Sequence, residues 1–475
     1  MAMRIVMKFG GTAINSADKV IHVANLIKSE KEKGNNDIVG VISAMRGMTD
    51  GILSMSEDIK RGDKASIGGF LKNMREVHLN IIEQAVKDVK IKNEARHVVT
   101  TLLEELDDIL GGIVLLAEIT PKSLDYLLSF GERLSTPIVS FVLRDIGLAC
   151  QYLTGKEAGI LTDSNFGEAR PLMDTTKLRL IHKIEPLLKR NIVPIITGFI
   201  GADQNGNTTT IGRGGSDYTA TIISAGINAD EVWLWSDVDG LMTADPRIVK
   251  DAAVIKEVSF AEAMEMALFG AKYMHPRALV PVIDTKIPVR IRNTFNVQNE
   301  GTFISQNLPK ASQKIVKSIS AIRHTALIDV GGGGGMVGAP GTAARIFDAL
   351  ARNRVNIMMI SQSPSESSIS MVVRKNDLDR ATTTLDLNLL GKVVKQVNVN
   401  DDVAVIAVVG SGMRGIKGVA ATVFNAVAKR NVNVIMIAQG SSELNLAFVV
   451  NDTDCEQAVR ALHDEFDLAK GGSKK

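Results

Sequence analysis

The C-terminal third of the chain contains an internal duplication, and this repeat places the strongest limit on the fold. The segment GMVGAPGTAARIFDALARNRVNIMMISQSPSESSISMVV begins at Gly335, and the segment GMRGIKGVAATVFNAVAKRNVNVIMIAQGSSELNLAFVV begins at Gly412. The offset of 77 residues (412 − 335) is constant, without a gap across the copy. Shared composition does not explain an ungapped match of this length, so we infer a duplicated structural unit.

Each copy has the pattern of a strand, a glycine-rich turn, a helix, two strands joined by a turn, and a second helix. The first copy is followed by a further predicted strand, whereas the second copy has none after its last helix. A spare predicted strand, 314–319, precedes the first copy. Because a sheet that lacks an edge strand exposes unpaired backbone, we expect this strand to complete the second unit. One unit, 322–392, would then be inserted within the other, 314–321 plus 393–475.

The N-terminal part, 1–305, alternates short apolar runs with amphipathic segments. Predicted strands cover 3–9, 38–43, 148–153, 192–200, 231–235 and 287–292. Predicted helices cover 17–31, 121–147, 174–189, 218–225, 259–269 and 276–285. The segment 49–112 has no convincing strand, so a helical lobe is expected at about 49–147. The alternation predicts an α/β fold, with an open, mostly parallel sheet covered by helices on both faces.

The composition is that of an ordinary soluble protein, with 45% hydrophobic and 23% charged residues. Lysine plus arginine number 55 and aspartate plus glutamate 53, and no basic run suggests a nucleic-acid partner. No apolar run reaches the roughly 18 residues of a membrane span, and the start, MAMRIVMKFGG, does not have the pattern of a signal peptide. The two cysteines, Cys150 and Cys455, indicate neither a disulfide framework nor a metal cluster. A cytoplasmic location is expected.

The stretch TTIGRGGSDYTA, 209–220, follows an apolar run and precedes a helical pattern. Its glycines permit a tight turn, and Arg213 offers a planar fork of donors for a carboxylate or phosphate. Ser216 and Asp217 are favourable helix N-cap residues. A strand, a glycine turn and a helix in this order can bind an anion, although the alternative is an ordinary connecting loop.

A second glycine turn, KFGGT at 8–12, ends the first predicted strand, where ligands of open α/β sheets bind. Lys8 and exposed backbone N–H groups could hold phosphates there, although the Walker A spacing is absent and a plain turn is the alternative. Other polar segments are VISAMRGMTD, SFGERLSTP, WSDVDGLMTADPR and FGAKYMHP. Taken one by one, these segments also suit a surface carboxylate, a capped turn or a structural histidine, His275.

Together with GFIGADQNGNTTTIGRGGSDYTA, these motifs occur in the order found in the aspartokinases. The chain therefore resembles that family, within the wider amino-acid kinase group, over nearly its whole length. The duplicated part is similar to the paired ACT domains of the family, each a ferredoxin-like βαββαβ unit that senses an amino acid. The resemblance implies an amino-acid kinase domain at 1–305, followed by two ACT domains.

The implied reaction is transfer of a phosphoryl group from ATP to the side-chain carboxylate of L-aspartate, giving 4-phospho-L-aspartate. This is the first step of lysine, threonine and methionine biosynthesis. The acceptor is already ionised at neutral pH, so it needs no general base, and catalysis rests on positioning and charge neutralisation. The resemblance assigns Lys8 to the transferring phosphate and Asp217 to holding Lys8. Mg²⁺ is expected to arrive with ATP, with no dedicated protein site.

The remaining assignments follow family motifs residue by residue. Arg213 would grip the α-carboxylate of aspartate and Glu132 its α-ammonium. The other substrate contacts are Ser43, Thr49, Phe199, Gly214, Gly215 and Ser216. The ATP contacts are Lys8, Phe9, Gly10, Gly11, Ser236, Asp237, Met242, Arg247 and Lys272, with Met242 where the family often has tyrosine. The effector contacts of the first ACT domain are Met336, Ala339, Asn356, Ile357 and Gln362.

The effector is expected to be lysine or threonine, and the sensing units are expected to pair in a homodimer or a dimer of dimers. Two alternatives remain. A related kinase would act on glutamate, acetylglutamate, carbamate or UMP, although Glu132 and Arg213 together favour a free α-amino acid. A non-catalytic amino-acid-binding regulator would use the duplicated part alone, although the KFGGT and RGGSD segments favour an enzyme.

Overall fold

The structure is a computed structural model, and it describes residues 2–269, 274–306, 308, 314–331, 340–365, 367–391 and 393–469. The chain divides into two compact units. The first comprises Met1–Leu241, Lys256–Phe260 and Tyr273–Asn307, and the second comprises Met242–Ile255, Ala261–Lys272 and Leu308–Lys475. The described part of the chain contains no helix that is both long and apolar enough to cross a membrane.

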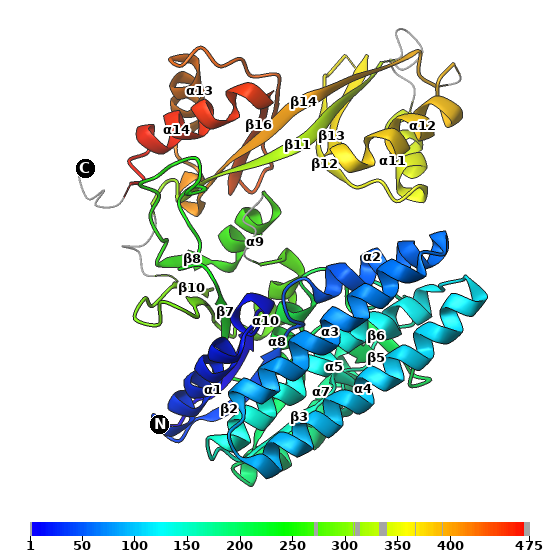
Figure 1. Ribbon diagram of the computed structural model, residues 1–475. Coiled ribbons are helices and arrows are strands. Elements are labelled where there is room, and N and C mark those ends of the chain that lie inside the picture. Colours follow the sequence, from blue (N-terminus) through cyan, green and yellow to red (C-terminus); the bar gives the residue numbers. More distant parts are fainter. Residues whose placement is uncertain are drawn as a thin grey trace. The chain divides into compact units, whose positions relative to one another are not determined.

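The first unit is built on an eight-stranded sheet with the order β3-β4-β2-β1-β7-β9-β10-β8 (Figure 1). Every neighbouring pair is parallel except β9–β10. The strands are β1 (Arg4–Phe9), β2 (Asp37–Ile42), β3 (Cys150–Leu153), β4 (Val193–Thr197), β7 (Glu231–Ser236), β8 (Glu257–Ser259), β9 (Val289–Asn293) and β10 (Thr302–Ser305). The central strands are mostly apolar because helices cover both faces, as predicted, and Lys8 in β1 is an exception.

Helices pack on each face of this sheet. One face carries α1 (Ala17–Glu32) and the helical lobe, whose members share one core with β1. The lobe consists of α2 (Met48–Arg61), α3 (Lys64–Ala85), α4 (Val89–Leu116) and α5 (Pro121–Asp145). The other face carries α7 (Met173–Lys189) and α8 (Gly215–Ile227). Shorter helices are α6 (Gly155–Ala158), α10 (Val280–Thr285) and the 3-10 turns η1 (Gly11–Ala13) and η2 (Pro276–Leu279).

The predicted strand 192–200 is wrong in one respect, because it is interrupted. β4 ends at Thr197, and the chain then enters β5 (Ile200–Ala202), which pairs with β6 (Thr208–Thr210) in a separate hairpin. Phe199 lies at the break with a positive φ of 65°, a conformation that a bulky residue rarely adopts. Its N–H donates to Thr219 Oγ1 at 2.9 Å, and its carbonyl accepts from Ile211 N at 3.1 Å. These bonds hold the turn that connects β4 to the hairpin.

The second unit contains a six-stranded antiparallel sheet with the order β12-β13-β11-β14-β16-β15. The strands are β11 (Ser318–Gly331), β12 (Ile357–Gln362), β13 (Ser368–Arg374), β14 (Gln396–Val409), β15 (Met436–Ala438) and β16 (Asn445–Asn451). The helices are α11 (Thr342–Arg352), α12 (Leu378–Asn388), α13 (Val419–Ala428) and α14 (Cys455–Glu465), and α9 (Phe260–Leu268) lies mostly in this unit. Short 3-10 turns are η5 (Lys375–Asp377), η6 (Ser411–Met413) and η7 (Asp452–Asp454).

The two longest strands of this sheet differ from the expectation. Sequence patterns predict separate strands at 314–319 and 392–399, whereas β11 and β14 each run for 14 residues through both repeats (Figure 1). The first part of β11, 318–322, pairs with the last part of β14, 405–409. The register shifts between Ile322 and Thr325, where His324 adopts a positive φ of 58°. A bulge of this kind bends a strand without ending its pairing, so one strand serves two repeats.

Candidate active site

Lys8 lies near the carboxyl end of β1 on the face that α8 covers. Its neighbours Met7 and Phe9 belong to the core under α1 and the helical lobe, and side chains alternate along a strand. Lys8 Nζ forms an ion pair with Asp217 Oδ1 at 2.5 Å, and each side chain is 13% exposed. The structure therefore brings together the two residues that the sequence assigns to phosphoryl transfer.

The glycine turn after β1 is closely packed against neighbouring backbone. A Cβ atom on Gly11 would lie 2.3 Å from the carbonyl oxygen of Ala44, so only glycine fits there. The Gly10 N–H donates to the Trp235 carbonyl at 3.3 Å, whereas the Gly11 N–H has no hydrogen-bond partner among the described residues. The Phe9 side chain stacks on Trp235 inside the core, with ring centroids 5.9 Å apart. Gly11 is thus better placed than Gly10 or the Phe9 side chain to meet a phosphate.

The loop after β2 is held between the glycine turn and α5. Ser43 N donates to the Phe9 carbonyl at 3.2 Å, and the Ser43 carbonyl accepts from Ser135 Oγ at 2.7 Å. A Cβ atom on Gly131 would lie 2.7 Å from Ala44 Cβ and 3.8 Å from Thr49 Oγ1. Helix α5 therefore contacts this loop directly: Ala44 and Thr49 lie beside its Gly131, and the Ser43 carbonyl is held by its Ser135.

Glu132 follows that glycine and is 3% exposed. Burial raises the pKa of its carboxyl group to about 8, although the Ala44 backbone N–H and the positive charge of Lys8 both oppose this shift. Its Oε2 has no hydrogen-bond partner among the described residues. A buried acceptor without a partner is costly, and an ammonium group would supply both a proton donor and a positive charge. Glu132 therefore has the properties of a receptor for an amino group.

The RGGSD turn is shaped by three close approaches. A Cβ atom on Gly214, whose φ is +69°, would lie 2.3 Å from His275 Cβ. One on Gly215 would lie 2.5 Å from Phe199 Cδ2, and one on Gly198 would lie 2.6 Å from Ser216 Oγ. Gly214 is the N-cap of α8, so the expectation that Ser216 and Asp217 cap the helix is wrong. Both lie in its first turn because the left-handed Gly214 starts the helix earlier.

Arg213 projects from this turn, is exposed, and forms no ion pair within the described residues. Burial lowers the pKa of His275, and the positive charges of Arg277 and Arg213 lower it further, while Asp217 opposes them. Arg213 and Asp217 are therefore both within electrostatic range of His275. Since Asp217 pairs with Lys8, and the charge of Lys8 acts on Glu132, these three groups lie near one another at the carboxyl end of β1, and Arg213 lies four residues before Asp217 in the same turn.

The predicted nucleotide residues are divided between the units. Ser236 ends β7, the neighbour of β1, and its Oγ donates to Asp237 Oδ1 at 3.3 Å. Met242 and Arg247 belong to the second unit, where Arg247 pairs with Asp245 at 2.5 Å. Lys272 lies outside the described residues. The ATP contacts of these last three residues stay predictions.

The sequence pattern of the amino acid kinase family matches residues 3–293, and that of the ACT domain matches residues 332–389 and 406–466. The chain is 34% identical over 467 residues to aspartokinase 1, chloroplastic, of Arabidopsis thaliana, covering 97% of this chain and 80% of that relative. The chain belongs to the aspartokinase family.

Solved structures of the aspartokinase family agree with the fold. E. coli aspartokinase III in complex with aspartate and ADP (R-state) has a TM-score of 0.84 and 29% identity, covering 97% of this chain and 99% of that one. Its complex with lysine and aspartate (T-state) has a TM-score of 0.80 at the same identity and coverage. The chain spans about half the length of the bifunctional relatives that it matches. It is 31% identical over 478 residues to bifunctional aspartokinase/homoserine dehydrogenase 1, chloroplastic, of Arabidopsis thaliana, covering 98% of this chain and 51% of the relative.

Two residues that support this aspartokinase-family site have no substrate or nucleotide contact assigned from the sequence. His275 supports Gly214, and its Nδ1 accepts from Arg277 N at 3.3 Å. The FGAKYMHP motif already pointed to His275 in the sequence, with a structural role as its plain interpretation. Asp125, in α5, is fully buried and belongs to no motif. Its burial was not expected from the sequence, because an aspartate in an amphipathic helix usually faces solvent.

The predicted effector residues are only partly described. Asn356 precedes β12 and Gln362 is its last residue; both are exposed, and Ile357 packs against the core of the first repeat. Met336 and Ala339 lie outside the described residues. The effector contacts therefore stay predictions.

Proposed function

We propose that this chain acts as an aspartokinase, transferring the γ-phosphoryl group of ATP to the side-chain carboxylate of L-aspartate. The observation that carries the proposal is the gathering of Lys8, Asp217, Glu132 and Arg213 about one site. The similar structure of E. coli aspartokinase III is a complex with aspartate and ADP, which supports the same pair of substrates here. The reaction would be the first step in the biosynthesis of lysine, threonine and methionine.

Phosphoryl transfer to a carboxylate needs no proton removal, so the residues supply charge and position. Lys8 would contact the β- and γ-phosphates and neutralise charge that develops during transfer. Asp217 holds the Lys8 ammonium through its 2.5 Å ion pair. The Gly11 N–H would donate to the same phosphates, because close packing against the Ala44 backbone holds the glycine turn in place at the end of β1.

Aspartate would be held at both ends of its α-amino-acid group. Arg213 would bind the α-carboxylate with two parallel hydrogen bonds, and Glu132 would bind the α-ammonium. Ser43, Thr49 and Ser216 would donate to the carboxylates. Phe199, which contacts Gly215, would line the pocket. This arrangement leaves the β-carboxylate directed toward Lys8, where the phosphoryl group arrives.

Mg²⁺ would enter with ATP as part of the substrate. Within the described residues no cluster of three or more His, Cys, Asp or Glu side chains is arranged to hold a metal ion. Asp217 is paired with Lys8, and Glu132 is protonated at neutral pH because its pKa is about 8. We therefore assign neither of these two carboxyl groups to the metal.

Feedback control by an amino acid, lysine or threonine, would act through the repeats, at Met336, Ala339, Asn356, Ile357 and Gln362. A lysine complex of E. coli aspartokinase III supports an amino-acid effector. We place the ACT domains at 322–392 and at 314–321 plus 393–475, because 318–322 pairs with 405–409. The sensing units would pair in a dimer or a dimer of dimers, because small sheets favour edge-to-edge completion. A cytoplasmic location is part of the proposal.

A hydroxamate assay tests the function, because hydroxylamine traps an acyl phosphate. The full chain with Mg²⁺·ATP should form hydroxamate from L-aspartate and little from L-glutamate at equal concentration. Equal or greater product from glutamate would favour the related-kinase alternative. Calorimetry that detects lysine or threonine binding but no ATP binding would favour the non-catalytic regulator.

A further inference from the structure

The strand that precedes the RGGSD turn is fastened to helix α5 by one buried carboxylate. Asp125 is fully buried and accepts three hydrogen bonds. Thr210, the last residue of β6, supplies two of them, from its backbone N at 2.8 Å and from its Oγ1 at 2.7 Å. Gly167 N supplies the third at 3.0 Å. Only Ile211 and Gly212 separate Thr210 from Arg213.

Helix α5 also carries Glu132, the proposed receptor for the α-ammonium group. Asp125 and Glu132 are seven residues apart, about two helical turns, so they lie on the same side of the helix about 10 Å apart along its axis. Both side chains are buried. A straight helix is a rigid spacer, so the position of Thr210 relative to Glu132 is fixed through Asp125.

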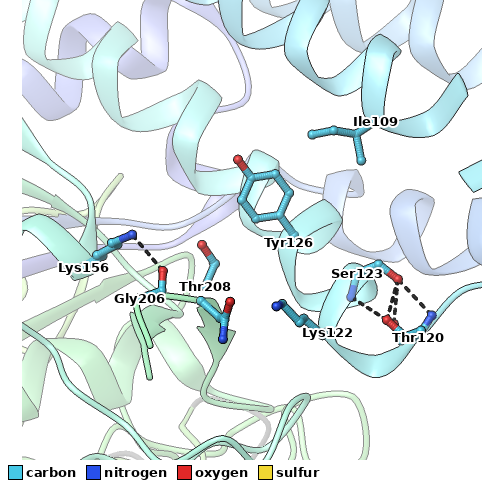
Figure 2. Close-up of a pocket in the computed structure, with 9 residues that line it drawn as sticks. Ile109, Thr120, Lys122, Ser123, Tyr126, Lys156, Gly206 and Thr208 are labelled. Carbon is cyan, nitrogen blue, oxygen red and sulfur yellow. Dashed lines mark hydrogen bonds between the residues drawn. The ribbon is translucent and has the colours of Figure 1, made fainter. Parts of the chain in front are cut away.

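The rest of the hairpin is attached to α5 less directly than Thr210 is. Beyond Thr210, toward the hairpin turn, it borders a cavity of about 390 Å³ (Figure 2). Tyr126 and Lys122 reach the cavity from α5, while Thr208 and Gly206 line it from the hairpin side. Lys156 Nζ donates to the Gly206 carbonyl at 2.8 Å, which ties the hairpin to α6 and not to α5. The bonds of Asp125 therefore fasten the hairpin to α5 close to Arg213.

We propose that Asp125 is a positioning residue for aspartate binding, which sets the separation between Arg213 and Glu132 by holding Thr210. The proposal rests on the proposed aspartokinase function. Asp125 touches neither substrate, and it acts through the strand that leads to Arg213. Loss of its hydrogen bonds should let the RGGSD turn shift, and small shifts of binding groups reduce catalysis strongly.

The hairpin supplies a matched control, Asp203, which is 3% exposed and lies at the opposite end of the hairpin. It accepts from Asn205 N, Asn207 N, Asn207 Nδ2 and Ser164 Oγ at 2.8–3.1 Å. Asp125→Ala and Asp203→Ala therefore each remove a buried carboxylate that satisfies several donors. They differ in that Asp125, unlike Asp203, joins the hairpin to α5.

The test compares steady-state kinetics and Tm of the full chain and its variants. Asp125→Ala should raise the KM for aspartate about ten-fold and leave the KM for ATP within about two-fold, while Asp203→Ala lowers Tm and leaves both KM values within about two-fold. Asp125→Asn should restore most of the loss, because its amide can accept from both N–H groups and donate to the Thr210 hydroxyl. Thr210→Val should raise the KM for aspartate about three-fold in the wild type. The same substitution should raise that KM by a smaller factor when Asp125→Ala is already present, because the two residues act through one contact.

The outcomes separate this proposal from the function on which it rests. An active wild type whose KM for aspartate is unchanged in Asp125→Ala overturns the positioning role alone. An equal rise in Asp203→Ala, or independent effects of Asp125→Ala and Thr210→Val, overturns it too. If Asp125→Ala does not fold, an unchanged KM for aspartate in Thr210→Val overturns the positioning role instead. A wild type without aspartate-dependent activity overturns the proposed function and this proposal together.

Discussion

Replacing Lys8 and replacing Arg213 should affect different kinetic constants, because Lys8 would contact the ATP phosphates and Arg213 would contact aspartate. Lys8→Ala removes the charge that neutralises the transferring group, so kcat should fall about 10²–10³-fold while the KM for aspartate changes little. Arg213→Ala removes a bidentate, charge-assisted contact, so the KM for aspartate should rise about a hundred-fold. Steady-state kinetics with each substrate varied separates the two effects. Normal turnover in Lys8→Ala would contradict its assignment.

Glu132 should make aspartate binding depend on pH. Its carboxyl pKa of about 8 in the free protein means that it is protonated at pH 7, whereas an α-ammonium group requires the carboxylate. The KM for aspartate should therefore fall as pH rises from about 6.5 to 8 and then level off. Burial lowers the pKa of His275, so this residue contributes less charge change over the range than an ordinary histidine would. Glu132→Gln should raise the KM and remove its slope with pH.

The same pKa shift has a consequence for stability that provides an independent check. A carboxyl whose folded pKa is raised above its unfolded value near 4.5 binds a proton in the folded state that the unfolded state releases. Its contribution to stability is therefore lost as pH rises through about 4.5 to 8. Glu132→Gln should raise the Tm relative to wild type more at pH 8 than at pH 5. An equal difference at both pH values would mean that the pKa is ordinary.

At the scale of elements, the buried ion pair between α9 and the segment before β11 should dominate the local stability of the second unit. Lys317 Nζ donates to Glu262 Oε2 at 2.9 Å, and the two side chains are 3% and 0% exposed. Glu262 Oε1 also accepts from Ser411 N and Oγ. Lys317→Met leaves a buried charge behind, which should cost about 3–5 kcal/mol in denaturant unfolding. Lys317→Met combined with Glu262→Gln should recover much of that loss, and no loss in the single variant would contradict the role of the pair.

The elements that could be predicted from sequence are those with long, regular apolar patterns. The central parallel strands of the first unit are mostly apolar runs, and the parallel pairing of the first two follows from their strand–helix–strand spacing. Strands β8 and β10, of three and four residues, are too short to show a period and have no predicted counterpart. The break at Phe199 is also hidden, because the apolar run continues through it.

The candidate site was predictable where the family motifs supply single residues, as at Lys8 and Asp217, whose ion pair the structure contains. It was not predictable where the partner is distant in sequence and unremarkable in type. Asp125 and Thr210 are 85 residues apart, and neither residue type suggests a buried contact on its own. Positioning residues of this kind become visible only when folding brings two elements together.

At the scale of the whole molecule, the duplication provides a matched test of where the effector binds. Residues 356 and 362 in the first repeat correspond, at the offset of 77, to Asn433 and Gln439 in the second. Asn356→Ala and Gln362→Ala should each raise the concentration of lysine or threonine that halves activity by about ten-fold, since a lost hydrogen bond to a charged ligand costs about 1.5–3 kcal/mol. Turnover without effector should not change, because neither residue lies in the kinase unit.

The second repeat then supplies the control for this prediction. Asn433→Ala and Gln439→Ala alter the same residue types at equivalent positions, so general damage to the six-stranded sheet would affect both pairs alike. If the effector binds the first repeat, inhibition should weaken only in the Asn356 and Gln362 variants. The reverse result would move the site to the second repeat, and equal weakening in all four would indicate that both repeats contribute to one response. Because coupling between binding sites is reciprocal, saturating aspartate should also weaken effector binding measured by calorimetry in the wild type.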